Sequence, residues 1–272
     1  MHLRSSLIAV ALAACEPPYE PIVICHNANC AGTGRHADDS IEGLSESLAL
    51  RLDGRSILDG VELDTYLYWD GAASHCLFAH DDRDPGASAT PLEAAAIVAE
   101  HLGAAGAAWN GERFYLKIEL KPTVAGVDLF HTGAQLHQHA ECAIDAVAAA
   151  VESPSIPVTV IFDSTSECLH DEVVLRLAQP KYQSLVDRDD LTFEYSGPLV
   201  PTRQCIPVPL DIRTVRVESW RDNSLGGLRP IMVWLDAGAD NTEALKINRY
   251  LRPEYIATSR AQFVRGWITG FQ

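Results

Sequence analysis

The stretch Val61-Glu62-Leu63-Asp64-Thr65-Tyr66-Leu67-Tyr68 constrains the fold most, because it places two acidic residues inside an otherwise apolar, strand-like run. Its aliphatic, aromatic and β-branched residues are typical of a core β-strand. Residues two apart on a strand point to the same side, so Glu62 and Asp64 share one face and Leu63 takes the other. A buried carboxylate is costly unless it is paired or bound to a metal. This pair therefore predicts a functional site on a core strand.

A second stretch repeats this arrangement. In Phe114-Tyr115-Leu116-Lys117-Ile118-Glu119-Leu120-Lys121, the three charged residues share one face and the aliphatic residues take the other. Two further apolar runs end directly at His26 and at His80. We expect Glu119 and both histidines to lie close to Glu62.

Strand-like and helix-like segments alternate along the rest of the chain. The expected strands are 21–25, 61–68, 76–79, 114–120, 158–162, 231–235 and 255–257, with 184–186 and 214–217 as weaker candidates. The expected helices are 41–52, capped by Asp38-Asp39-Ser40, one that begins after Thr90-Pro91, then 136–151, 167–177 and 242–251.

This alternation, with nearly eight apolar strands, predicts an α/β fold with a mostly parallel sheet. A TIM-type (β/α)8 barrel is favoured over an open doubly wound sheet, with an irregular part at residues 182–220. The strand ends of such a barrel meet at one mouth, where active sites are built. The acidic residues and histidines would converge there.

Composition narrows the possible partners. The 272 residues are 47% hydrophobic, which is enough for a sizeable core, and the formal net charge is −16. Nucleic-acid binding needs clustered Lys and Arg, so an acidic chain argues against a nucleic-acid partner. An anionic phosphate substrate would likewise need a bound cation to hold it.

The N-terminus has the pattern of an export signal. Residues 1–4 are short and basic, residues 7–14 are apolar, and Leu12-Ala13-Ala14-Cys15 matches a bacterial lipobox. We predict a signal peptide at 1–14, lipidation of Cys15, a tether at 15–20 and one barrel domain at 21–272 that carries the predicted site. The chain would then be a lipoprotein of the bacterial cell envelope, periplasmic or on the outer surface, anchored to the membrane. The alternative is ordinary cleavage and secretion.

Six cysteines remain after Cys15, an even number that favours disulfides in an exported chain. Cys25 and Cys30 flank His26, which raises the possibility of a zinc site. A second Cys pair of similar spacing is missing from the sequence, so structural disulfides are the better interpretation. The sequence does not decide their pairing.

The residue types at the predicted mouth define a chemistry. Three carboxylates are ligands for a hard divalent cation, two imidazoles transfer protons, and Lys121 can hold an anionic oxygen. This combination suits hydrolysis of a phosphodiester, with one histidine as base and the other as acid. Each motif is weak alone; their order and strand context give the prediction its weight.

At these residues the chain resembles the glycerophosphodiester phosphodiesterase family, within the wider phosphatidylinositol-phospholipase-C-like barrel superfamily. The resemblance is strongest over residues 21–122. The matching motifs are His26-Asn27-Ala28, Ala37-Asp38-Asp39-Ser40-Ile41-Glu42, Glu62-Leu63-Asp64-Thr65, Trp69-Asp70-Gly71, His80-Asp81 and Ile118-Glu119-Leu120-Lys121.

The resemblance implies that Glu62, Asp64 and Glu119 hold one calcium or magnesium ion, and that His26 and His80 are the acid–base pair. It implies hydrolysis of a glycerophosphodiester to glycerol phosphate and an alcohol.

The family's arginine beside the first histidine is Asn27 here, so phosphate affinity would come from the metal and Lys121. His26-Asn27 is similar instead to the metal-dependent phosphoinositide phospholipases C, where the asparagine is a calcium ligand. Asn27 is therefore a fourth candidate ligand.

Two alternatives stay open. One is a phospholipase of the phosphoinositide C type or of the sphingomyelinase D type, although the Asp-Asn-Pro-Trp ending of the latter is missing. The other is a catalytically silent surface lipoprotein that binds a ligand or partner. The presence of both histidines and all three carboxylates favours an enzyme.

Overall fold

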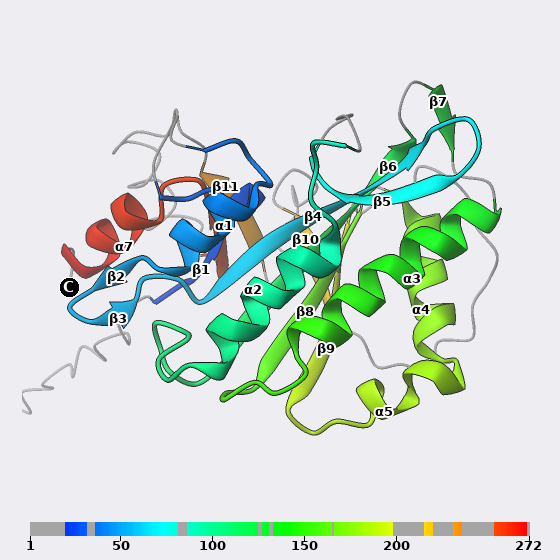
Figure 1. Ribbon diagram of the computed structural model, residues 1–272. Helices are drawn as coiled ribbons and strands as arrows, with labels where there is room; N and C mark the ends of the chain where they lie inside the picture. The colour runs from blue at the N-terminus through cyan, green and yellow to red at the C-terminus, as the bar shows by residue number, and fades with distance from the viewer. Residues whose placement is uncertain are drawn as a thin grey trace, which may run out of the picture.

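The computed structural model describes residues 20–31, 36–80, 86–124, 127–130, 133–164, 166–197, 215–219, 231–235 and 253–270 (Figure 1). The predicted signal peptide, Cys15, Asp81 and the expected helix at 242–251 lie outside these residues. None of the helices among the described residues combines the length and the apolar composition needed to cross a membrane.

Eight of the described strands form a closed parallel ring. They are β1 (Ile22–Cys25), β4 (Gly60–Trp69), β6 (Phe114–Val124), β8 (Val158–Asp163), β9 (Leu191–Gly197), β10 (Val215–Ser219), β11 (Ile231–Leu235) and β12 (Tyr255–Thr258). Each pairs in parallel with the next along the chain, and β12 pairs with β1. This is the topology of a (β/α)8 barrel, so the predicted fold class is confirmed.

Two hairpins extend the barrel wall beyond its mouth. Strand β5 (Ser74–Phe78) returns antiparallel along β4, and β7 (Val127–Phe130) returns along β6. Figure 1 shows these strands beside the far ends of β4 and β6. The first hairpin turns at Asp70-Gly71, as the sequence indicates, and the Asp70 carboxylate accepts the amides of Ala72 and Ala73 at 2.7 Å. A small separate hairpin joins β2 (Arg51–Leu52) to β3 (Arg55–Ser56).

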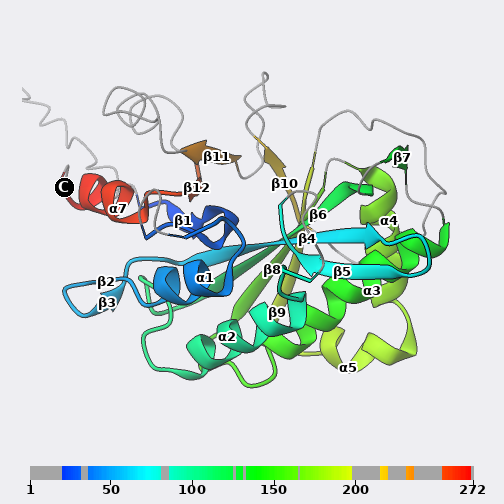
Figure 2. The ribbon, with the colours of Figure 1, turned by 45° about the horizontal axis from the view of Figure 1, so that its top comes forward.

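Helices cover the outside of the barrel. They are α1 (Ile41–Leu48), α2 (Pro91–Gly103), α3 (Gly133–Ala150), α4 (Glu167–Leu177), the short α5 (Gln183–Val186) and α7 (Ala261–Gly270), with 3₁₀ turns η1 (His26–Ala28) and η2 (Pro180–Tyr182). Consecutive helices α1 to α4 pack side by side (Figure 2). Helix α2 begins as predicted, with Pro91 in its first turn and a capping box between Thr90 and Glu93.

Two sequence expectations are wrong. The expected helix at 41–52 ends at Leu48, because Asp53 and Gly54 both adopt positive φ and close the β2–β3 hairpin. The expected strand at 184–186 is part of α5, and the strand of this region is β9. A short apolar run does not distinguish strand from helix, whereas the alternating aromatic residues of β9 do.

The interior of the barrel is layered. Its lower part is an apolar cluster of Ile24, Ile161, Met232, Tyr255 and Ala257, with Ile22 and Tyr115 packed against it. The charged residues of β4 and β6 follow this layer toward the carboxyl ends of the strands. The opposite faces of these strands supply Leu63, Leu116, Ile118 and Leu120 to the core beneath the helices.

A buried ion pair joins the last helix to the first strands. Arg265 of α7 contacts Asp59 at 2.6 Å and donates to the Ile57 carbonyl at 3.0 Å, and both charged side chains are almost fully buried. Asp59 also accepts the Val23 amide at 3.0 Å, and the Arg265 guanidinium lies 4.8 Å from the Trp109 ring centre. The pair therefore links β1, β4 and α7 at the amino ends of the strands.

We expect Arg265→Met to lower the free energy of unfolding by about 3–5 kcal/mol, because it leaves Asp59 as an uncompensated buried charge. Lys181→Met is the control. It removes an exposed ion pair to Asp145, so a loss below about 1 kcal/mol is expected. Urea denaturation measures both, and equal losses would contradict this role for Arg265.

Candidate active site

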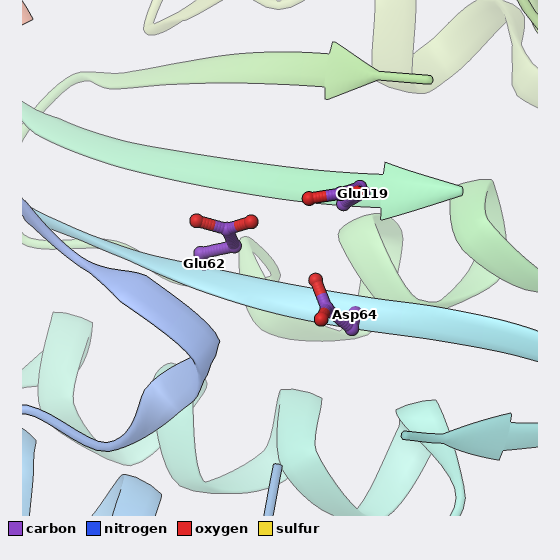
Figure 3. Close-up of side chains that lie close together, drawn as sticks. All are labelled: Glu62, Asp64 and Glu119. Carbon is purple, nitrogen blue, oxygen red and sulfur yellow. The ribbon is translucent and has the colours of Figure 1, made fainter. Parts of the chain in front are cut away.

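Three carboxylates converge inside the mouth of the barrel. Glu62 and Asp64 of β4 are fully buried, and Asp64 lies opposite Glu119 of β6 in the strand register. One oxygen from each of the three side chains lies within 4.8 Å of the others (Figure 3). Glu62 and Asp64 thus share one face of β4, as predicted from the sequence. The pairing of β4 with β6 brings Glu119 beside them.

Several of these buried oxygens receive no hydrogen bond from the described residues. They are Glu62 Oε2 and both oxygens of Asp64. Lys121 Nζ lies 3.2 Å from Asp64 Oδ2 but is not placed to donate a hydrogen bond to it. Leaving charged oxygens buried without donors costs free energy, and oxygen ligands of this kind are what calcium and magnesium bind. The donor set therefore fits a hard divalent cation.

Two lysines balance part of the charge. Lys117, fully buried, lies 2.7 Å from Glu62, 2.6 Å from Asp163 and 3.3 Å from Glu119. Lys121 lies 2.6 Å from the other Glu119 oxygen. Burial by itself lowers the pKa of Lys117, but the carboxylates of Asp163, Glu62 and Glu119 raise it well above its ordinary value, so the ammonium stays charged.

The carboxylates still outnumber the ammonium groups, and their pKa values reflect this. Burial raises the pKa of Glu62 well above 4.5 despite the Lys117 contact. Burial also raises the pKa of Asp64 well above 3.8, and Asp39, Glu119 and Glu62 raise it further. Burial has the same effect on Glu119, but Lys117 and Lys121 outweigh it and hold its pKa well below 4.5.

Asn27 lies in η1, which packs against β4. Its backbone is left-handed, with φ of 51°, and its Oδ1 is buried without a hydrogen bond from the described residues. Its carbonyl accepts the Asp39 amide at 2.9 Å. Because η1 packs against β4, this buried oxygen lies on an element next to the strand that carries Glu62 and Asp64. Its role as a metal ligand stays a prediction.

The two histidines reach the same mouth by different routes. Cys25 pairs with Val61, so His26 follows β1 at the level of Glu62. The β5 strand returns along β4 until the Ala79 amide donates to the Asp64 carbonyl at 3.2 Å, and His80 comes next. Both histidines are half-buried. The backbone therefore brings both histidines to the same edge of β4, opposite the edge that pairs with β6.

Three site residues were missed by the sequence argument. Asp163 ends the apolar run of β8, the same signal that selected His26 and His80, and Lys117 shares the face of Glu119. Asp39 was assigned to a helix cap, but the cap of α1 is Ser40, which accepts the Gly43 amide at 3.1 Å.

Disulfides form as the sequence favours, with pairs Cys25–Cys30 and Cys76–Cys142, and Cys168 is also disulfide-bonded. Cys25 and Cys30 are therefore not zinc ligands.

No protein-family model and no curated protein matches the chain by sequence. Among solved structures, it is similar to a calcium-dependent phosphoinositol-specific phospholipase C from a Gram-negative bacterium, Pseudomonas sp., at a TM-score of 0.44 and 10% identity. The alignment covers 88% of this chain and 89% of that one. The chemistry of the site has to be inferred from its own side chains.

The raised pKa of Asp64 predicts the pH dependence of the metal-free protein. The folded state binds the carboxyl proton of Asp64 more tightly than the unfolded state does. The protonated Asp64 therefore adds to the free energy of unfolding fully below pH 3.8, and this addition is lost as pH rises through the raised pKa. Asp64→Asn should therefore make the metal-free protein more stable near neutral pH and flatten its loss of stability with pH.

Urea denaturation with a chelator, at about pH 5 and near neutral pH, measures this. Asp70→Asn is the control: backbone amides and His75 lower the pKa of Asp70 to about 2, so its removal should not stabilise the protein at neutral pH. If the metal-free Asp64→Asn protein is less stable than the parent near neutral pH, the raised pKa of Asp64 is contradicted.

Proposed function

We propose that the chain is a metal-dependent phosphodiester hydrolase. The observation that carries the proposal is the group of buried carboxylate oxygens on Glu62 and Asp64, beside Glu119, that receive no hydrogen bond from the part of the chain that the structure describes. A catalytically silent barrel would have no reason to keep these charges buried, since replacing them with neutral residues would stabilise it.

The chain would hold one divalent cation through Glu62, Asp64, Glu119 and Asn27, with calcium or magnesium as the candidates. When bound, the cation polarises a phosphoryl oxygen and neutralises charge on the phosphate. Lys121, at the outer end of the charged row on β6, would contact a phosphate oxygen. Lys117 lies deeper and engages three carboxylates, so its role is to fix them in place.

The histidines supply the proton transfers. Their backbone positions support this role, because β1 and β5, which lead to them, both run along β4, the strand that carries Glu62 and Asp64. One would deprotonate the attacking hydroxyl group while the other protonates the leaving alcohol oxygen. A phosphodiester requires both steps, because its leaving alkoxide is a poor leaving group without a proton.

The proposed substrate is a glycerophosphodiester, cleaved to glycerol phosphate and an alcohol. A phosphoinositide is the second candidate, and one observation favours it. Asn27 stands where an arginine would otherwise clamp phosphate, and its buried oxygen receives no hydrogen bond from the residues that the structure describes. Disulfides support export to an oxidising compartment. The lipid anchor proposed at Cys15 would keep the enzyme close to membrane phospholipids.

We expect turnover of glycerophosphocholine or phosphatidylinositol with calcium or magnesium and its loss with a chelator. His80→Ala should lower kcat by about a hundredfold to ten-thousandfold, the range for general acid–base catalysis. His75→Ala on the same hairpin is the control, because His75 pairs with Asp70 in solvent. Activity that survives chelation would contradict the metal mechanism, and no turnover of any diester by the folded, metal-loaded protein would favour a binding function.

Asn27→Ala should weaken calcium binding by at least about tenfold, because even the groups that only orient ligands are worth 10–100-fold in metal affinity. Asn110→Ala is the control. Its Oδ1 accepts the Glu112 amide at 2.9 Å in an exposed turn, outside the proposed ligand set. Calorimetric titration of the metal-stripped proteins measures both, and an unchanged affinity of Asn27→Ala would remove it from the ligand set.

A further inference from the structure

The Cys25–Cys30 disulfide closes a small ring around the first catalytic motif. The two cysteines are five residues apart, with a Cα–Cα distance of 5.5 Å, and both are buried. His26 and Asn27 lie between them. The ring thus contains one proposed acid–base group and one proposed metal ligand.

The backbone inside this ring is in an unfavourable conformation. Asn27 and Ala28 both have positive φ, at 51° and 52°. Asparagine tolerates the left-handed region because its side chain can bond locally, but alanine has no such compensation. Two successive residues of this kind persist only where the surroundings impose the conformation, and such sites cluster where function needs a fixed geometry.

Non-covalent contacts also hold the ring, among them the bonds of the Asn29 amide to His36 and Asp38. Ser47 Oγ accepts the Cys30 amide at 2.9 Å and donates to the Ala28 carbonyl at 3.3 Å. The Asp39 amide donates to the Asn27 carbonyl. These bonds hold one side of the turn, whereas the disulfide fixes the distance between its two ends.

We propose that the Cys25–Cys30 disulfide is a positioning element of the metal centre. It holds Asn27 and Ala28 in the left-handed region, so that the buried Asn27 oxygen stays beside the carboxylates of β4. This inference rests on the proposed function, since it assumes that Asn27 binds the cation.

The second disulfide provides a natural contrast. Cys76–Cys142 spans 66 residues and ties β5 to α3, outside the ring. A disulfide stabilises mainly by restricting the unfolded chain, and the effect grows with the length of the closed loop. The short ring around Asn27 therefore contributes less to the free energy of unfolding than the long loop does. Its main effect is to fix the backbone conformation of the turn.

The test compares Cys25→Ala/Cys30→Ala with Cys76→Ala/Cys142→Ala in the otherwise intact chain. Calcium affinity is measured by calorimetric titration after metal removal, and Tm by scanning calorimetry. The first variant should lose at least about tenfold in calcium affinity, as for other groups that orient metal ligands. The second should lose more Tm and keep its affinity within about twofold, because its loop is longer and neither cysteine lies beside a proposed ligand in the sequence.

A rescue separates geometry from general stability. Ala28→Gly added to Cys25→Ala/Cys30→Ala should restore part of the calcium affinity, because glycine enters the left-handed region without steric cost. Ala28→Gly alone should leave affinity unchanged within about twofold. If the double alanine variant is unfolded by circular dichroism, Cys30→Ala alone breaks the same bond and carries the same expectations.

Unchanged affinity without the disulfide, or no recovery with glycine, would overturn the inference and leave the proposed function standing. A parent protein that binds no calcium would overturn the proposed function, and the inference with it.

Discussion

The candidate active site depends on buried carboxylates that have too few hydrogen-bond and ion-pair partners among the described residues. Glu62 and Asp64 lose their hydration inside the barrel, and Lys117 compensates only part of that loss through its contacts with Glu62, Glu119 and Asp163. Breaking a buried charge pair costs about 3–5 kcal/mol, so unpaired charges at this depth weigh heavily against a net stability of about 5–15 kcal/mol. Binding of a cation, as proposed, would offset this cost.

Buried carboxylates at the two ends of the barrel differ in their hydrogen bonding. At the amino ends of the strands, Asp59 is bonded by Arg265 and by backbone amides, which serves stability. At the carboxyl ends, both Asp64 oxygens receive no hydrogen bond from the described residues. The same chemical group is therefore structural at one end and available for ligands at the other.

Local sequence rules predicted much of this arrangement. The two-residue period placed Glu62 with Asp64 and aligned the charges of β6, and the strand–helix alternation predicted the barrel. Lys117 and Asp163 could not be paired from sequence, because their contact arises when β8 docks in register on β6. The prediction of a strand at 184–186 was wrong because three residues show too little periodicity to distinguish a helix from a strand.

The central claim is that oxygens on β4, β6 and η1 bind a divalent cation. Anomalous diffraction from crystals grown with calcium tests this most directly. The account predicts one calcium peak at about 2.3–2.6 Å from oxygens of Glu62, Asp64, Glu119 and Asn27, with Lys117 still paired to Asp163. The absence of a peak at these oxygens, in crystals that contain calcium elsewhere, would contradict it.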